Sequence, residues 1–121
     1  MSSRRLLVID DEADFRTFVR RVGEKSGFEV ELAADARAFK ALYKSLDPTV
    51  IVLDIVMPET DGIELIQWLG GEGCSARIVI VSGFDPRYSR AAEIFGSTLG
   101  SLSITRLSKP VTLADLEAAL G

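Results

Sequence analysis

Residues 50–54 read Val-Ile-Val-Leu-Asp, four consecutive apolar residues that stop abruptly at a carboxylate. A short unbroken apolar run of this kind predicts a strand that is buried on both faces of a sheet. Residues 6–9 and 78–81 are two further runs of the same type, and they are followed by Asp10 and Ser82. These three runs predict the interior strands of the fold.

Weaker signals surround these runs. Residues 28–33 alternate between apolar and charged side chains, which predicts a strand with one solvated face near a sheet edge. Residues 102–107 predict a fifth strand, and Asp35 and Thr112 can cap helices. Apolar residues at helical spacing predict five helices between and after the strands. These residues are Phe15, Phe18, Val19 and Val22; Phe39, Leu42, Tyr43 and Leu46; Ile66 and Leu69; Tyr88, Ala91, Ala92 and Phe95; and Leu113, Leu116 and Leu120.

Five strands that alternate with five helices predict an α/β protein with a parallel sheet covered on both faces. The doubly wound, flavodoxin-like strand order 2-1-3-4-5 is the leading choice for this pattern. The length of 121 residues fits a single domain, so we assign residues 1–121 to one unit.

Composition excludes several function classes. The chain is 47% apolar and 26% charged with a net charge of -4, which is typical of a folded protein without a nucleic-acid-binding surface. The absence of histidine excludes Ser-His-Asp triads and histidine metal sites. The single cysteine, Cys74, excludes an internal disulfide and fits a reducing compartment. No apolar run approaches the roughly 20 residues needed to cross a bilayer, so we expect a cytoplasmic protein without a membrane partner.

Polar residues follow the predicted strands at the ends where ligands bind in this architecture. Asp10 and Asp11 follow the first strand, Asp54 the third, Ser82 the fourth and Lys109 the fifth. Three carboxylates in one cleft repel one another, and Mg²⁺ with its preference for oxygen ligands relieves this. A lysine and a hydroxyl are what a phosphoryl group needs as charge shifts over its oxygens. Asp54 is the best nucleophile, since it ends the central strand.

Four segments resemble the signature blocks of receiver domains of two-component response regulators: residues 8–12 (VIDDE), 52–62 (VLDIVMPETDG), 80–83 (IVSG) and 108–110 (SKP). The resemblance implies phosphotransfer to Asp54 from a histidine of a sensor kinase or of a histidine phosphotransfer protein. It also implies a downstream effector, and it leaves a homodimer open. A domain of this family catalyses its own phosphorylation and dephosphorylation rather than turnover of a separate substrate.

The resemblance also implies roles for the other site residues. Asp11 would ligate Mg²⁺ directly, and Asp10 would act on it mainly through water. Asp54 and the carbonyl of Val56 would complete the protein ligands. Ser82 would donate a hydrogen bond to a phosphoryl oxygen, Lys109 would pair with it, and the bond from Lys109 to Pro110 would be cis.

The sequence departs from the family at three places. Many receivers have a tyrosine or phenylalanine three residues before the lysine, where this chain has Arg106, whose guanidinium cannot fill an apolar pocket in the same way. The interval from Ser82 to Lys109 is longer than in chemotaxis-type receivers, with the extra residues at 93–103. By the same resemblance, Val56 and Phe84 flank the path of a hydrolytic water. Neither side chain can hydrogen-bond to that water, so we expect slow self-dephosphorylation, unless Phe84 turns away onto the fourth helix and leaves the path open.

Three alternatives compete with a phosphorylated switch. A pseudo-receiver that works without phosphorylation is the nearest, since Arg106 indicates altered switching. A phosphohydrolase of the haloacid dehalogenase class needs an acid two residues after the nucleophile, where this chain has Val56. A flavodoxin needs a phosphate loop after the first strand, where the acidic residues 10–12 would repel a phosphate.

Overall fold

The computed structural model describes residues 4–55, 57, 61–83 and 102–121. The predicted helix around residues 88–95, Val56, Phe84 and all but the last two residues of the expected enlargement at 93–103 lie outside these residues. In the part of the chain that is described, no helix is long and apolar enough to span a membrane.

Five parallel strands form one sheet in the order β2-β1-β3-β4-β5, which confirms the predicted topology. The strands are β1 (Arg5–Ile9), β2 (Glu29–Ala33), β3 (Val50–Asp54), β4 (Arg77–Ser82) and β5 (Ser103–Ser108). Every residue of β3 is buried, as its apolar run predicts. The alternating strand β2 lies at an edge, also as predicted.

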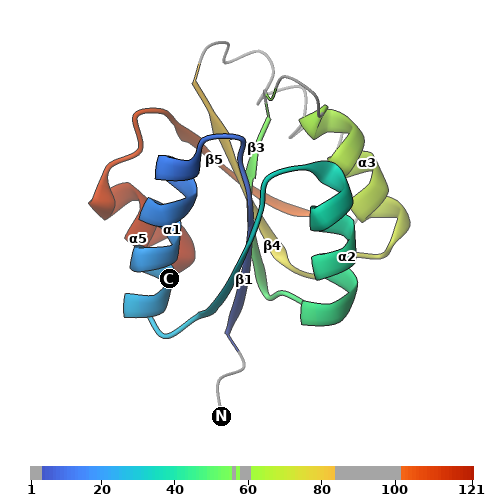
Figure 1. Cartoon of the computed structure of the whole chain (residues 1–121), viewed down its shortest axis with the longest axis horizontal. Helices are drawn as coiled ribbons and strands as arrows, with labels where there is room; N and C mark the ends of the chain where they lie inside the picture. The colour runs from blue at the N-terminus through green and yellow to red at the C-terminus, as the bar shows by residue number, and fades with distance from the viewer. Residues whose placement is uncertain (1–3, 56, 58–60, 84–101) are drawn as a thin grey trace.

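Helices cover both faces of this sheet. Figure 1 shows α1 (Ala13–Lys25) and α5 (Leu113–Leu120) on one side of the sheet, with α2 (Ala36–Leu46) and α3 (Gly62–Gly71) on the other. These four of the five predicted helices fall within the described ranges.

Successive strand residues supply two separate cores, because side chains along a strand point to opposite faces. In β1, Leu7 and Ile9 pack with α2 and α3, whereas Leu6 and Val8 pack with α1 and α5. Burying both faces in this way holds the strand ends in fixed positions, which matters for the polar residues at one edge of the sheet.

Helix boundaries follow local signals in most places. The Asp35 side chain accepts a hydrogen bond from the Ala38 backbone N–H, and Thr112 accepts one from Asp115, so both predicted caps are confirmed. Gly27, with a φ of 89°, lies just after the end of α1. The left-handed region is accessible to glycine at little steric cost.

Several apolar residues are less buried than a regular helical pattern predicts, and one helix extends into a pair of glycines. Leu113, the first residue of α5, is 51% exposed, whereas Leu116 and Leu120 of the same helix are buried. Phe15, Phe18 and Trp68 are only partly buried at the margins of the two cores. Gly70 and Gly71 lie within α3, and the chain has a left-handed backbone conformation at Gly73, with a φ of 69°.

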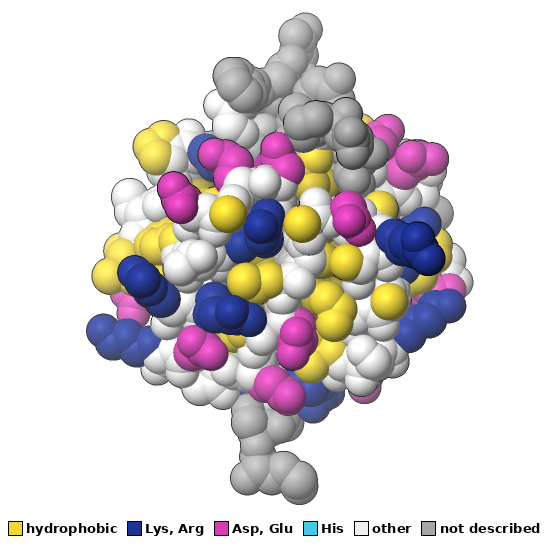
Figure 2. All heavy atoms as spheres, in the orientation of Figure 1, with side chains coloured by type: hydrophobic (Ala, Val, Ile, Leu, Met, Phe, Trp, Pro, Cys, Tyr) yellow, Lys and Arg dark blue, Asp and Glu magenta, His cyan; other side chains and the backbone are white. Residues whose placement is uncertain are grey.

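Charged side chains of both signs are interspersed over the face shown in Figure 2. The described residues on this face form no continuous basic patch, in keeping with the net charge of -4.

Candidate functional site

The polar residues predicted to gather do lie at one edge of the sheet. Asp10 directly follows β1, Asp54 and Ser82 are the last residues of β3 and β4, and Lys109 directly follows β5. Because all five strands are parallel, their carboxyl ends share one edge. β1 and β3 are neighbours although α1, β2 and α2 separate them in the chain, so Asp10 and Asp54 meet at the point where strand order reverses.

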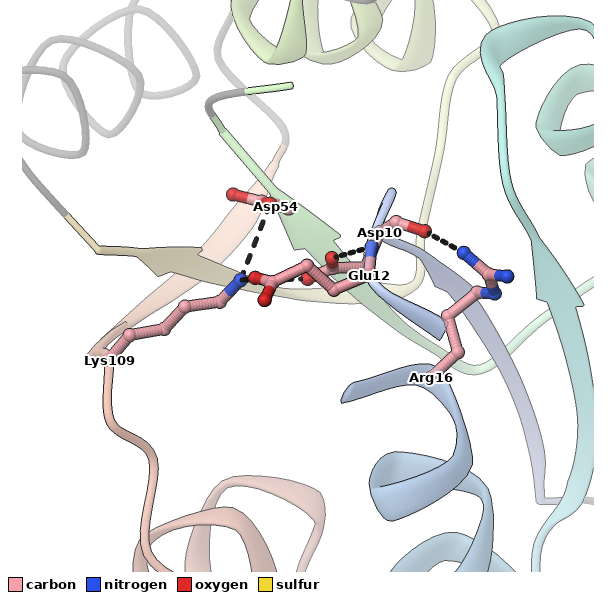
Figure 3. Close-up of polar contacts among 5 residues, drawn as sticks. All are labelled: Asp10, Glu12, Arg16, Asp54 and Lys109. Carbon is pink, nitrogen blue, oxygen red and sulfur yellow. Dashed lines mark hydrogen bonds and ion pairs between the residues drawn. The ribbon is translucent and has the colours of Figure 1, made fainter. Parts of the chain in front are cut away.

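Lys109 joins the carboxylates of this edge. Its Nζ lies 2.8 Å from Glu12 Oε1, 3.1 Å from Asp10 Oδ2 and 3.5 Å from Asp54 Oδ2 (Figure 3). Burial alone would lower the pKa of the ammonium, but hydrogen bonds to Glu12 and Asp10 and the charge of Asp54 raise that pKa well above its usual value. Nζ also lies 4.7 Å from the centre of the Phe15 ring, at a distance where a cation and an aromatic face attract.

Asp10 is the most enclosed of the carboxylates, with no exposed surface. Burial raises its pKa, while a hydrogen bond from the Glu12 backbone N–H to Oδ1 (2.8 Å) and the pairing with Lys109 oppose this change. The Arg16 guanidinium donates a 2.6 Å hydrogen bond to the Asp10 backbone carbonyl, so the start of α1 is tied to the end of β1 (Figure 3). Asp10 is therefore held rigidly between the two elements.

Asp11 and Glu12 extend the acidic group toward solvent. Asp10, Asp11 and Glu12 each offer a carboxylate oxygen, and these oxygens lie within 4.8 Å of one another. Close carboxylate oxygens of this kind fit a hard divalent cation such as Mg²⁺. Glu12 was not among the residues to which the sequence analysis assigned a role; the signal that could have found it is its place as the third acid of the run 10–12.

Backbone contacts fix the position of Lys109 relative to β4. Its N–H donates a 2.9 Å hydrogen bond to the carbonyl of Ser82, and Ser82 itself is 7% exposed. The peptide bond from Lys109 to Pro110 is cis, as the resemblance implied. Ser82 thus lies at the same edge as the carboxylates. The carbonyl of Val56, the remaining ligand expected for a metal, lies outside the described residues.

Arg106 occupies the strand position where many receivers have an aromatic residue. It pairs in register with Ile80 of β4, and its side chain is exposed. A long cationic side chain therefore stands on β5 three residues before Lys109.

The site therefore has a nearly buried carboxylate, Asp54, at the switch point of a doubly wound sheet, beside a lysine and an acidic group. The family model for the response regulator receiver domain matches residues 6–121. This chain belongs to that family, whose members are signalling domains of two-component phosphorelays.

Curated relatives support the same assignment. The chain is 32% identical over 120 residues to the photosynthetic apparatus regulatory protein RegA of Rhodobacter capsulatus, covering 98% of this chain and 62% of that protein. It is 34% identical over 118 residues to the response regulator MprA of Mycobacterium tuberculosis, covering 98% of this chain and 49% of that protein. The chain thus spans 62% and 49% of the length of these two relatives.

Solved structures agree with the fold. The receiver domain of the Francisella response regulator 1452 superposes with a TM-score of 0.82 at 25% identity, covering 98% of this chain and 93% of that one. The receiver domain of NtrX from Brucella abortus gives a TM-score of 0.81 at 26% identity, covering 95% of this chain and 97% of that one.

Proposed function

We propose that Asp54 accepts a phosphoryl group from a phosphohistidine of a sensor kinase or of a histidine phosphotransfer protein. The observation that carries this proposal is the position of the Lys109 ammonium, which lies between the carboxylates of Asp10 and Asp54 at the switch point. The phosphorylated domain then acts on a downstream effector domain or protein.

The transfer is a displacement at phosphorus. An Asp54 carboxylate oxygen forms a bond to phosphorus while the bond from phosphorus to the donor's imidazole nitrogen breaks, and the electron pair of that bond stays on the nitrogen. Lys109 donates a hydrogen bond to a phosphoryl oxygen, and so does the Ser82 hydroxyl. A backbone hydrogen bond from Lys109 to Ser82 places the two residues side by side at this edge, so both side chains can serve the same phosphoryl group.

Mg²⁺ would be held by Asp10, Asp11, Asp54 and the carbonyl of Val56. The fit rests on the donor set, since Asp10, Asp11 and Glu12 offer carboxylate oxygens that lie within 4.8 Å of one another. When bound, Mg²⁺ would offset the negative charge of the carboxylates and of the incoming phosphoryl group.

The test is incubation with Mg²⁺ and acetyl phosphate, followed by intact mass measurement. We expect one added phosphoryl group on the wild type, none on Asp54→Asn, and one on Asp14→Asn, which changes an exposed carboxylate of α1. Addition to Asp54→Asn at the wild-type extent would show that another residue is the acceptor.

A pseudo-receiver that binds its partner without phosphorylation is the second candidate, and Arg106 favours it. The cation replaces the aromatic residue that moves inward in many phosphorylated receivers, so a different switching surface is expected. The same experiment separates the two candidates, because a pseudo-receiver would gain no phosphoryl group under any donor condition.

A further inference from the structure

The three hydrogen-bond donors of the Lys109 ammonium all have carboxylate partners. A lysine ammonium carries three N–H groups, and Glu12, Asp10 and Asp54 each accept from Nζ. A phosphoryl oxygen on Asp54 would need one of these donors. The contact with Asp54 is the longest of the three, and its donor can turn to that oxygen; any closer approach of the ammonium to Asp54 then comes at the expense of the contact with Glu12 or with Asp10.

The contacts with Asp10 and with Glu12 are not equally costly to lose. The Asp10 side chain has no exposed surface, so removing its ammonium would leave a buried carboxylate without an opposite charge. The Glu12 side chain is 63% exposed, and water can replace the ammonium there at little cost. The contact between Lys109 and Glu12 is also the shortest of the three, at 2.8 Å.

The backbone around Glu12 favours this arrangement. Glu12 precedes the first turn of α1, yet its side chain makes no capping hydrogen bond to that helix. Its backbone N–H is instead fixed by Asp10 Oδ1. The side chain is thus placed at the mouth of the site and reaches across it to Lys109, as Figure 3 shows.

We propose that Glu12 is a positioning residue that holds Lys109 at the mouth of the site in the resting domain, and so restrains phosphorylation of Asp54. The proposal rests on the proposed function, in which Lys109 donates to the phosphoryl group. Glu12 releases Lys109 when the phosphoryl oxygen arrives, while Asp10 keeps its partner.

Three variants separate the effect of the contact between Glu12 and Lys109 from the effect of the negative charge of Glu12. Glu12→Gln removes the charge at nearly the same shape. Glu12→Asp keeps the charge but is one methylene shorter, so its carboxylate no longer reaches Lys109 as closely. Asp14→Asn removes a neighbouring exposed charge that has no contact with Lys109 among the interactions of the described residues. Urea unfolding of all three checks that none has lost its fold.

The first readout is the rate of phosphorylation by acetyl phosphate, at a Mg²⁺ concentration shown by titration to saturate each variant. We expect Glu12→Gln and Glu12→Asp to react about two- to fivefold faster than the wild type, the range that corresponds to loss of an exposed ion pair. Asp14→Asn is expected to stay close to the wild-type rate. Rates of both Glu12 variants at or below wild type would overturn the proposal. Acceleration of Glu12→Gln alone would also overturn it, because charge rather than contact with Lys109 would then be the cause.

The second readout needs no phosphodonor. The Nζ and Cε signals of the Lys109 side chain, assigned by their loss in Lys109→Arg, are recorded by NMR in each variant. We expect both Glu12 variants to shift these signals and Asp14→Asn to leave them in place. If the wild type gains no phosphoryl group, the proposed function has failed, and these signals alone decide whether Glu12 holds Lys109. Unchanged Lys109 signals in both Glu12 variants would show that Glu12 does not position Lys109.

Discussion

Gly62, the first residue of α3, makes a close backbone contact directly behind the site. A Cβ atom there would lie 2.6 Å from Ile55 Cα and 2.7 Å from the Ile55 carbonyl oxygen. Backbone atoms cannot turn aside as a flexible side chain can, so we expect Gly62→Ala to lower the free energy of unfolding by about 1–3 kcal/mol. Gly71 is the last residue of the same helix, and a Cβ atom there would have no neighbour within 4 Å. We therefore expect Gly71→Ala to raise the free energy of unfolding by about 0.5–1 kcal/mol. Urea unfolding measures both changes, and a change of the same sign at the two positions would contradict this account.

The phenol of Tyr43 provides a second prediction for a single residue. Burial, together with a hydrogen bond to the Cys74 thiol, raises the pKa of Tyr43 to about 12. The pKa in an unfolded chain is about 10, so the folded state keeps the proton more tightly and loses this stabilisation as the pH rises from about 10 to 12. We expect Tyr43→Phe to lose less stability than the wild type over this interval. Urea unfolding at pH 8, 10 and 11 tests the prediction, which fails if the two proteins decline in parallel.

At the scale of elements, the starts of the helices divide into two kinds. Among the helices of the described residues, three begin at a residue whose side chain accepts a backbone hydrogen bond: Asp35 for α2, Asp61 for α3 and Thr112 for α5. Helix α1 begins after Glu12, whose side chain pairs with Lys109 instead. The side chain at the start of α1 therefore interacts with the site, whereas the side chains at the starts of α2, α3 and α5 stabilise their own helices.

This division predicts different costs of substitution. Asp35→Ala removes an acceptor 2.9 Å from the Ala38 backbone nitrogen, and we expect it to lower the free energy of unfolding by about 1 kcal/mol. Glu12→Ala removes no capping hydrogen bond, so we expect it to lower the free energy of unfolding by clearly less than Asp35→Ala does. Circular dichroism during urea unfolding measures both values. A larger loss for Glu12→Ala would mean that its pairing with Lys109 contributes more to the fold than helix capping does.

At the scale of the whole molecule, the parallel sheet concentrates negative charge at one edge, and the net charge is also negative. A cation that binds only the folded state stabilises it by mass action. At ten times its Kd, we expect Mg²⁺ to add about 1.4 kcal/mol to the free energy of unfolding. This corresponds to a rise in Tm of roughly 4–6 °C for a domain of this size.

Thermal unfolding with and without Mg²⁺ measures that rise. Asp11→Ala is expected to abolish it, since Asp11 is the proposed direct ligand, and Asp14→Asn is expected to retain it. A rise that persists unchanged in Asp11→Ala would remove Asp11 from the metal site.

The strand order and the edge at which the polar residues meet followed from local pattern. Unbroken apolar runs such as 50–53 indicate strands buried on both faces, and right-handed crossovers leave few ways to connect them. Once the sheet is parallel, residues that end its strands must share an edge, so Asp10, Asp54, Ser82 and Lys109 could be placed together from their positions in the chain. The caps at Asp35 and Thr112 were equally predictable, because a cap depends on residues only three apart.

Only the tertiary structure decided which of the two exposed acids after Asp10, Asp11 or Glu12, pairs with Lys109. Asp11 and Glu12 are adjacent exposed carboxylates, and nothing in their local sequence separates their roles. The turn from β1 into α1 directs Glu12 across the edge to a lysine 97 residues away. The exposure of Leu113 was settled in the same way, since its place in the first turn of α5 relative to the sheet depends on how that helix docks. Contacts of this kind depend on where two distant elements lie in space, whereas periodicity and spacing report only on the element that contains them.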